Sequence, residues 1–259
     1  MVAQQHFKAR PSDLILASYP KSDTTWLKAL LFVTVHRRCN ADSSTPHSLE
    51  THSPHQCVPF LEIEMYTNDK IPNLDLLLSP RLFATHVPFG SLPESITGSN
   101  CKIIYIWRDP KDNLISWWHF INKLRAKANM EPSPLDKTDE LFCNGRPHQV
   151  LFLTYEGLNE DPCGNLKRLA EFVGCPFSVD EEKGGVLDGI LKLCEFTNLK
   201  NLAMRNNEGT QIGELAIQNS LLFRRGGVED WVNHLTPETA RRIDEITESK
   251  FGDQAGLIL

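Results

Sequence analysis

The segment SYPKSDTTW, residues 18–26, holds side chains that suit a phosphate or a sulfate. It lies between an apolar run and the start of a helical pattern, and a helix N-terminus offers unpaired N–H groups to an anion. Lys21 adds an ammonium group, and Ser22, Thr24 and Thr25 add hydroxyl donors. We therefore interpret the segment as an anion-binding loop. A capped polar turn is the alternative, because the glycines of a P-loop are absent.

Asp23 brings a carboxylate into the middle of this loop. Two like charges 4 Å apart repel by about 1 kcal/mol in water and by about 4 kcal/mol at an effective dielectric constant of 20. Lys21 and the partial positive charge of the helix N-terminus offset part of this repulsion. The sequence therefore predicts that the loop binds its anion weakly.

Two further candidates lie where apolar runs end. His86 ends the run RLFATH just before a turn that contains proline, where parallel sheets place their active sites; for this residue taken alone, a surface histidine at a strand end is the favoured alternative. Arg108 ends the run KIIYIWR, and Ser116 lies on the helix after it. The Arg108 guanidinium can fork onto a phosphate at the carboxyl edge of a parallel sheet, or it can pair with Asp109 or Asp112.

A basic turn, FRRGG, covers residues 223–227. Arg224 and Arg225 can make bidentate contacts with a phosphate, and Gly226 lets the backbone approach it closely. A solvated surface turn has the same composition. Several basic segments in one chain, together with the loop at residues 18–26, favour anion binding more than any one of them alone.

Other chemistries fit the sequence less well. Four potential zinc ligands, His47, His52, His55 and Cys57, have a spacing that fits no standard pattern, and no metal site is predicted. The nucleophile motif GxSxG is absent, which disfavours an α/β-hydrolase. A small-molecule kinase is disfavoured because no Walker glycines and no magnesium-binding carboxylate are evident.

Short apolar runs are the predicted strands that position these residues, at 13–19, 81–86, 102–108 and 150–155. Helical patterns cover 24–38, the segment from Pro110 onward, 165–173, 185–196 and 236–251. In the helix after Pro110, the expected buried stripe is Leu114, Trp118 and Ile121. Residues 40–60, rich in Ser, Thr, His and Pro, are expected to form a loop.

Strands that alternate with helices indicate an α/β fold with a central parallel β-sheet flanked by helices. We expect one domain over residues 1–259, with residues 1–12 as a disordered tail. The net charge of −6 disfavours nucleic acid and anionic membranes as partners, and no apolar run is long enough to span a membrane. Seven cysteines without a CxxC pair suit reduced thiols in the cytoplasm.

Six motifs resemble those of the cytosolic sulfotransferases, most closely the plant branch: YPKSDTTW, RLFATHVPFGSLPESI, CKIIYIWRDPKDNLISWWHF, VLFLTYEGL, LCEFTNLKNL and FRRGGVEDWVNHLTPETARRID. The resemblance covers nearly the whole chain. It implies a P-loop-like nucleotide-binding fold and 3′-phosphoadenosine-5′-phosphosulfate (PAPS) as the sulfuryl donor, with no metal. The implied acceptor is a small hydroxylated compound of phenolic, flavonoid, steroid or glucosinolate type.

The resemblance also implies a role for each matching residue. The 5′-phosphosulfate would contact the loop residues Lys21, Ser22, Asp23, Thr24 and Thr25, and Trp26 would stack on the adenine. The 3′-phosphate would be held by Arg108, Ser116, Arg224, Arg225 and Gly226. Tyr155 and Phe196 would flank the nucleotide. His86 is the implied catalytic base, and Lys21 is implied in catalysis as well as in donor binding.

This chain departs from the family pattern at several places. The family usually has glycine at the position of Asp23 and serine at the position of Glu195, so both changes bring negative charge toward a polyanionic donor. The family has a longer N-terminus and a further segment between residues 141–145 and 146–153. The alternative function is therefore a shortened, catalytically impaired paralogue that at most binds PAPS or its product 3′-phosphoadenosine 5′-phosphate (PAP).

The dimer motif of the family, KxxxTVxxxE, is also altered. The aligned positions are Val232, Thr236, Pro237 and Arg241, so the lysine and the glutamate of the motif are both replaced. We therefore expect a monomer.

Overall fold

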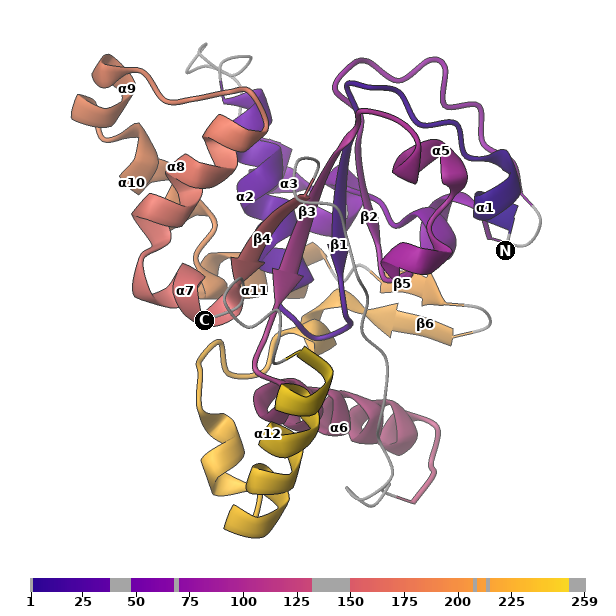
Figure 1. Cartoon of the computed structure of the whole chain (residues 1–259), viewed down its shortest axis with the longest axis vertical. Helices are drawn as coiled ribbons and strands as arrows, with labels where there is room; N and C mark the ends of the chain where they lie inside the picture. The colour runs from indigo at the N-terminus through magenta and orange to yellow at the C-terminus, as the bar shows by residue number, and fades with distance from the viewer. Residues whose placement is uncertain are drawn as a thin grey trace.

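The computed structural model describes residues 2–37, 48–67, 70–131, 150–206, 209–212 and 215–251. A parallel sheet in the order β2-β1-β3-β4 forms its centre (Figure 1). The strands are β1 (Leu14–Ser18), β2 (Leu82–Thr85), β3 (Lys102–Trp107) and β4 (Val150–Thr154). All four lie inside the predicted apolar runs, which confirms the α/β fold class and places β1 and β3 in the middle of the sheet.

Helices cover both faces of this sheet, and β1 divides the two cores. Leu14 and Leu16 face one core, and Ile15 and Ala17 face the other, because successive side chains of a strand point to opposite sides. The first core contains side chains from α2 (Thr24–His36), α8 (Pro162–Phe172), α10 (Val186–Leu193) and α11 (Phe196–Asn206). The second contains side chains from α1 (Val2–His6), the π-helix η1 (Leu61–Met65) and α5 (Glu94–Thr97).

Residues 2–12, expected to be a disordered tail, pack instead against the second core. Phe7 is 1% exposed and makes edge-to-face contacts with Tyr66 and Phe83. Asp13 forms a buried ion pair with Arg81 (2.5 Å), whose guanidinium also donates to a backbone oxygen of the same segment. Core packing therefore holds this segment in place. The expectation of disorder was based on its polar composition and did not take the burial of Phe7 into account.

Two other expectations need correction. The predicted loop 40–60 contains short helices, α3 (Ser48–Thr51) and α4 (Pro54–Cys57), while residues 40–47 lie outside the described residues. In α6 (Pro110–Lys127) the expected stripe of Leu114, Trp118 and Ile121 is only partly buried. The side chains of Ile115, Ser116 and Phe120 are buried in their place, because α6 turns a mixed polar and apolar face toward the site described below.

The C-terminal part completes the molecule around α6. An antiparallel hairpin, β5 (Gly209–Ile212) and β6 (Leu215–Gln218), leads to the 3₁₀ helices η4 (Asn219–Leu222) and η5 (Asp230–Asn233) and to α12 (Pro237–Phe251). The remaining elements are η2 (Phe89–Ser91), α7 (Tyr155–Glu160) and α9 (Val179–Lys183). A Lys111–Asp244 ion pair joins α6 to α12, below the sheet in Figure 1.

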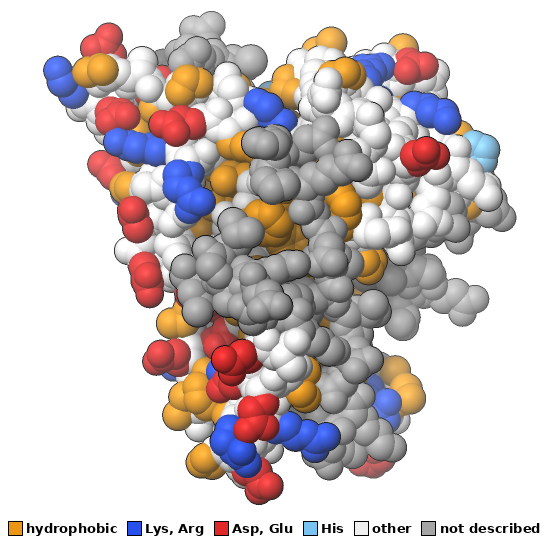
Figure 2. All heavy atoms as spheres, viewed as in Figure 1, with side chains coloured by type: hydrophobic (Ala, Val, Ile, Leu, Met, Phe, Trp, Pro, Cys, Tyr) orange, Lys and Arg blue, Asp and Glu red, His pale blue; other side chains and the backbone are white. Residues whose placement is uncertain are grey.

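Two expectations from the sequence concern the charge of the surface and the absence of a membrane span. Acidic and basic side chains are mixed over α8, α9 and α12 on the face shown in Figure 2. Within the described ranges, no helix combines the length and the apolar character that a membrane span requires.

Candidate functional site

A cavity of about 760 Å³ lies beside the carboxyl ends of β1, β2 and β3. The predicted site residues that line it are Lys21, Asp23, Thr24, Thr25, His86, Ser116, Phe196, Arg108, Arg224, Arg225 and Gly226. A pocket of about 300 Å³ shares Asp23, Phe196 and Gly226 with it and is also lined by Trp26, Tyr155 and Glu195. The structure thus gathers the predicted residues at one edge of the sheet, except Ser22, which lines neither space.

The loop between β1 and α2 has a strained backbone. Lys21 (φ 69°) and Asp23 (φ 64°) are both in the left-handed region that glycine favours. Ser22 turns away from the cavity and accepts a hydrogen bond from Asn113 Nδ2 (2.9 Å). Lys21 Nζ donates to the Leu222 carbonyl (3.2 Å), so the ammonium is directed across the cavity. Burial lowers the pKa of Lys21 to about 8, although Asp23 opposes the shift.

Asp23 lies among the cations of the site. Its Oδ2 is 3.9 Å from Arg108 Nη1, and 27% of its side chain is exposed. Burial raises the pKa of Asp23, while Arg108 and Lys21 act to lower it. The carboxyl group therefore competes with any anionic ligand for the same positive charges.

His86 follows β2 and faces the cavity beside this loop. Its Nδ1 lies 2.8 Å from the Ser18 carbonyl oxygen, and its backbone N–H donates to Glu62 Oε1 (2.7 Å). Because a carbonyl oxygen can only accept, Nδ1 carries the proton and Nε2 keeps its lone pair. Burial lowers the pKa of His86 to about 4, although the Ser18 contact raises it in part. The imidazole is therefore a neutral base at pH 7.

The Arg108 guanidinium is fixed at the end of β3. It donates to the carbonyl oxygens of Lys21 (3.3 Å) and Gly227 (3.2 Å), and it lies 4.5 Å from the centre of the Tyr155 ring. Asp112 Oδ2 is 3.8 Å from its Nη2. Arg108 Nε is buried and has no hydrogen-bond partner among the described residues. Arg108 lines the cavity, so the charge of its guanidinium group acts on an anionic ligand there.

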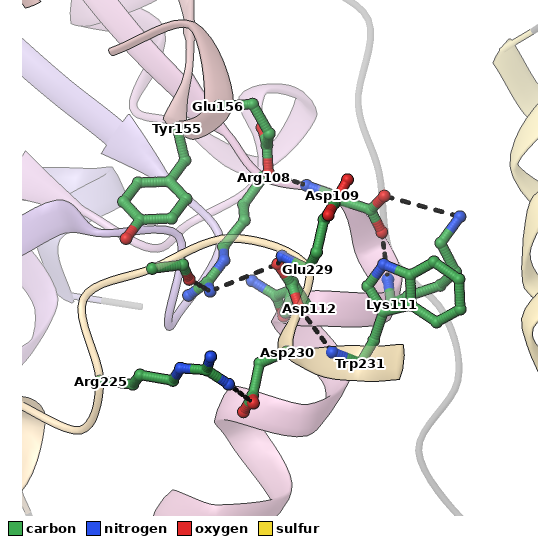
Figure 3. Close-up of polar contacts among 12 residues, drawn as sticks. Arg108, Asp109, Lys111, Asp112, Tyr155, Glu156, Arg225, Glu229, Asp230 and Trp231 are labelled. Atoms are coloured by element: carbon green, nitrogen blue, oxygen red, sulfur yellow. Dashed lines mark hydrogen bonds and ion pairs between the residues drawn. The ribbon is translucent and has the colours of Figure 1, made fainter. Parts of the chain in front are cut away.

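The two aspartates proposed as partners of Arg108 have different roles (Figure 3). Asp109 caps α6 by accepting from Lys111 N (2.8 Å), and its side chain lies 3.5 Å from Lys111 Nζ. Asp112 pairs with Arg108 and also accepts from the backbone N–H groups of Glu229 (2.6 Å) and Trp231 (2.9 Å). Asp112 therefore holds the segment that precedes α12 against α6.

Arg224 and Arg225 extend into the site from the basic turn. Each donates to one carboxylate oxygen of Asp230; Figure 3 shows the Arg225 contact. Burial acts to raise the pKa of Asp230, but hydrogen bonds from Arg224, Asn233 and Arg225 hold it well below its usual range. Arg224 Nε is a second buried donor without a partner among the described residues. Two arginines that line the cavity thus each have one buried nitrogen without a partner among the described residues.

The neighbouring pocket suits an aromatic base. Trp26 and Tyr155 meet edge to face with ring centres 6.2 Å apart. Gly226 has φ 69°, and a Cβ there would lie 2.6 Å from a Phe196 ring carbon, so only glycine fits the close approach of these two segments. Together with the cationic side chains that line the cavity, the pocket fits a nucleotide that carries phosphate groups.

Some residues of the site were missed or read differently. No sequence pattern distinguishes Asn113 or Glu62, which act through contacts with the loop and with His86. His55, considered as a zinc ligand, lies within hydrogen-bond distance of Thr25 and Lys28 instead, and His47 lies outside the described residues.

Among the described residues, the one group with metal-like geometry is His119, Asp230 and His234. Both carboxylate oxygens of Asp230 are already occupied by arginines, whose charge disfavours a cation.

The comparison with known proteins agrees with this geometry. The family model described as the sulfotransferase domain matches residues 11–147 and 144–255. The chain belongs to the sulfotransferase family. Cytosolic sulfotransferase 15 of Arabidopsis thaliana is 42% identical over 274 residues, which cover 97% of this chain and 75% of the relative. A flavonol sulfotransferase-like protein of Flaveria bidentis is 42% identical over 279 residues, covering 100% of this chain and 87% of the relative.

Solved sulfotransferase structures share the fold. A candidate steroid sulphotransferase of Arabidopsis thaliana superposes with a TM-score of 0.68 at 34% identity, covering 96% of this chain and 80% of the other. A mouse sulfotransferase in complex with PAP gives a TM-score of 0.68 at 26% identity, covering 96% of this chain and 87% of the other. The resemblance stated from the motifs is thus confirmed for the family and the fold.

Proposed function

We propose that this sulfotransferase moves a sulfuryl group from PAPS to a hydroxyl group of a small metabolite, in the cytosol for which its relatives are named. The observation that carries the proposal is the position of His86. Its unprotonated Nε2 belongs to a ring that lines the same cavity as the anion-binding loop and the basic turn. A proton acceptor and an anion site in one cavity are what sulfuryl transfer to an alcohol requires.

The donor would be bound by the cationic groups of the site. The proposed contacts to its 5′ end are Lys21, Ser22, Thr24 and Thr25, and those to its 3′-phosphate are Arg108, Ser116, Arg224, Arg225 and the backbone at Gly226. Trp26, Tyr155 and Phe196 would surround the adenine. The guanidinium groups of Arg108 and Arg224 support this assignment, because both residues line the cavity and a phosphate is a preferred partner of a guanidinium group. Ser22 is its weakest member, since its hydroxyl is held by Asn113.

In the proposed step, the acceptor hydroxyl gives its proton to His86 Nε2 as its oxygen bonds to sulfur. The bond between sulfur and the 5′-phosphate oxygen breaks, so a sulfate ester and PAP are the products. The Ser18 carbonyl keeps the imidazole in the tautomer that accepts this proton. Lys21, protonated at neutral pH, places its charge where negative charge increases on the leaving phosphate.

The acceptor side of the cavity is largely apolar. Its lining side chains include Phe60, Ile63, Val87, Trp117, Phe120 and Leu222, with Gln4 and Ser91 as polar groups. Such a lining favours a flat acceptor with one reactive hydroxyl group, such as a phenol, a flavonoid or a steroid. A glucosinolate-type acceptor is less favoured, because its sugar hydroxyls bring further polar groups into an apolar space.

A second candidate is a protein that binds PAP or PAPS without turnover. Two carboxyl groups near the proposed donor site favour it, because negative charge there opposes a polyanionic donor. Asp23 Oδ2 lies 3.9 Å from Arg108 Nη1, and Glu195 lines the pocket of about 300 Å³. Calorimetry with PAP and mass spectrometry of PAPS with a panel of hydroxylated acceptors separate the two. Binding with a sulfated product supports the enzyme, and binding without one supports the second candidate. Absence of binding contradicts both.

A further inference from the structure

A chain of three side chains lies behind the anion-binding loop. His55 Nε2 is 3.2 Å from Thr25 Oγ1, and His55 Nδ1 is 3.2 Å from Lys28 Nζ. Thr25 and His55 both line the cavity, although His55 is only 6% exposed, and Lys28 is 0% exposed. The chain thus runs from the protein interior, between α2 and α4, to a hydroxyl group at the proposed donor site.

The aromatic ring of Phe60 holds this chain in place. Lys28 Nζ lies 3.4 Å from the centre of that ring, and the His55 ring stacks on it at 5.8 Å with an interplanar angle of 29°. Burial lowers the pKa of Lys28 to about 7, although Glu64 and Glu62 act to keep it charged. Burial, followed by the charge of Lys28, lowers the pKa of His55, so its ring is neutral.

The direction of each hydrogen bond follows from these protonation states. In its charged form Lys28 has no lone pair, so the ammonium group donates to Nδ1 of His55, 3.2 Å away. The single proton of the neutral ring is therefore on Nε2, which donates to Thr25 Oγ1. Because that oxygen is accepting, its own O–H is left to point elsewhere, and the cavity is the space that Thr25 lines.

We propose that His55, oriented by Lys28, is a positioning residue that turns the Thr25 hydroxyl toward the 5′-phosphate end of the sulfuryl donor. The inference rests on the donor binding of the proposed function. A threonine hydroxyl can rotate and can accept as well as donate. A hydrogen bond accepted from His55 uses one of the two lone pairs of the hydroxyl oxygen and narrows the directions open to its O–H before the anion arrives, which lowers the cost of ordering the site.

The first test measures the tautomer in the protein without ligand. Long-range ¹H–¹⁵N NMR of the imidazole rings is expected to show His55 with a protonated Nε2, assigned by comparison with the His55→Gln protein. Lys28→Met removes the ammonium while keeping the length of the side chain, and we expect it to abolish this fixed tautomer. A protonated Nδ1 in the parent protein overturns the inference without any reference to the donor.

The second test compares two ligands by calorimetry: PAP and adenosine 3′-phosphate, which lacks the 5′-phosphate. His55→Leu should weaken PAP binding about tenfold to hundredfold, the effect of one hydrogen bond to a charged group. Binding of adenosine 3′-phosphate should stay within about twofold of the parent. His55→Gln, whose amide N–H can replace that of Nε2, should recover most of the PAP affinity. Equal losses for both ligands would indicate a purely structural role and overturn the proposal.

A double-mutant cycle provides the control for folding. In a Thr25→Val background the hydroxyl is absent, so His55→Leu should change PAP binding by less than about twofold. A full effect of His55→Leu in that background contradicts the inference. The parent protein could show the Nε2 tautomer and yet bind no PAP. That result would contradict the proposed function, and the 5′-phosphate could then not be the ligand of the Thr25 hydroxyl. PAP binding with the other tautomer contradicts the inference alone.

Discussion

The imidazole of His86 is hydrogen-bonded to the backbone of the adjacent strand: its Nδ1 lies 2.8 Å from the carbonyl oxygen of Ser18. Ser18 is the last residue of β1. Thr85 is the last residue of β2, and His86 is the next residue in the chain. The register Ala17↔Thr85 brings the two strand ends together. The proposed base is therefore oriented by the sheet itself, and the parallel pairing of two strands decides which nitrogen faces the cavity.

The pH dependence of transfer should report this buried histidine. His86 must be neutral to accept a proton, and its pKa is lowered to about 4 from an ordinary 6.5. The base is therefore active across pH 5 to 7, and kcat should decline only as pH falls toward that lowered pKa. We expect a nearly flat kcat from pH 7 down to pH 5, measured with PAP binding as a control for folding. An acid limb centred near 6.5 would contradict the assigned environment of His86.

Replacing the base tests its role directly. His86→Asn should lower kcat by about 10²–10⁴, the usual contribution of a general base. PAP binding should remain within about tenfold of the parent, because the ring acts on the proton of the acceptor. Turnover rates measured beside PAP affinities would check both statements. Near-parental turnover would show that another group takes the proton.

The basic turn should recognise the 3′-phosphate. Arg224→Ala is expected to weaken PAP about tenfold to hundredfold and adenosine 5′-phosphate, which lacks the 3′-phosphate, far less. Arg242→Ala, at an exposed position on α12, is the matched control and should change neither affinity. Similar losses for both nucleotides would place Arg224 away from the 3′-phosphate.

Asp23 should limit donor affinity. Removing its charge from the neighbourhood of Arg108 and Lys21 is expected to tighten PAP binding by about one to three decades in Asp23→Gly. Asp23→Asn keeps a side chain that tolerates the left-handed backbone and removes only the charge, so it separates repulsion from strain. Calorimetry at low and high salt measures both effects. An unchanged affinity in both variants would mean that the carboxyl does not oppose the anion.

The altered dimer motif leads to a prediction about assembly. Val232 is 60% exposed, and Arg241 pairs with Glu245 of its own helix. We expect sedimentation to show a monomer. A tight dimer that substitutions at Thr236 dissociate would overturn this expectation.

Much of the site could be predicted because the carboxyl ends of parallel strands meet at one edge. Once the apolar runs ending near Ser18, His86 and Arg108 were read as strands, their polar end residues had to be neighbours. The sequence also marked the basic turn, since consecutive arginines before glycines are uncommon in a buried segment. These inferences needed only local pattern and the rules of sheet topology.

The rest depends on contacts between segments distant in sequence. The pairing of Thr25 with His55 requires the exact placement of a short helix within a region that reads as a loop, and that placement is set by core packing. Asp230 contacts both arginines of the basic turn, yet nothing in its local sequence distinguishes it from a surface aspartate. The burial of Phe7 likewise depends on Tyr66 and Phe83, which are brought near it only by the complete fold.

The carboxylate of Asp230 has one more consequence. Since it contacts both Arg224 and Arg225, the chain supplies its own counter-ion at the proposed phosphate site. A ligand that binds there exchanges one anion for another, so few salt ions need to be released. A small inorganic anion gains little from such an exchange, whereas a nucleotide anchored by its base and by two phosphates can displace the carboxylate. The Asp230 carboxylate therefore lowers the affinity of the two arginines for small anions more than their affinity for ligands that have several points of attachment.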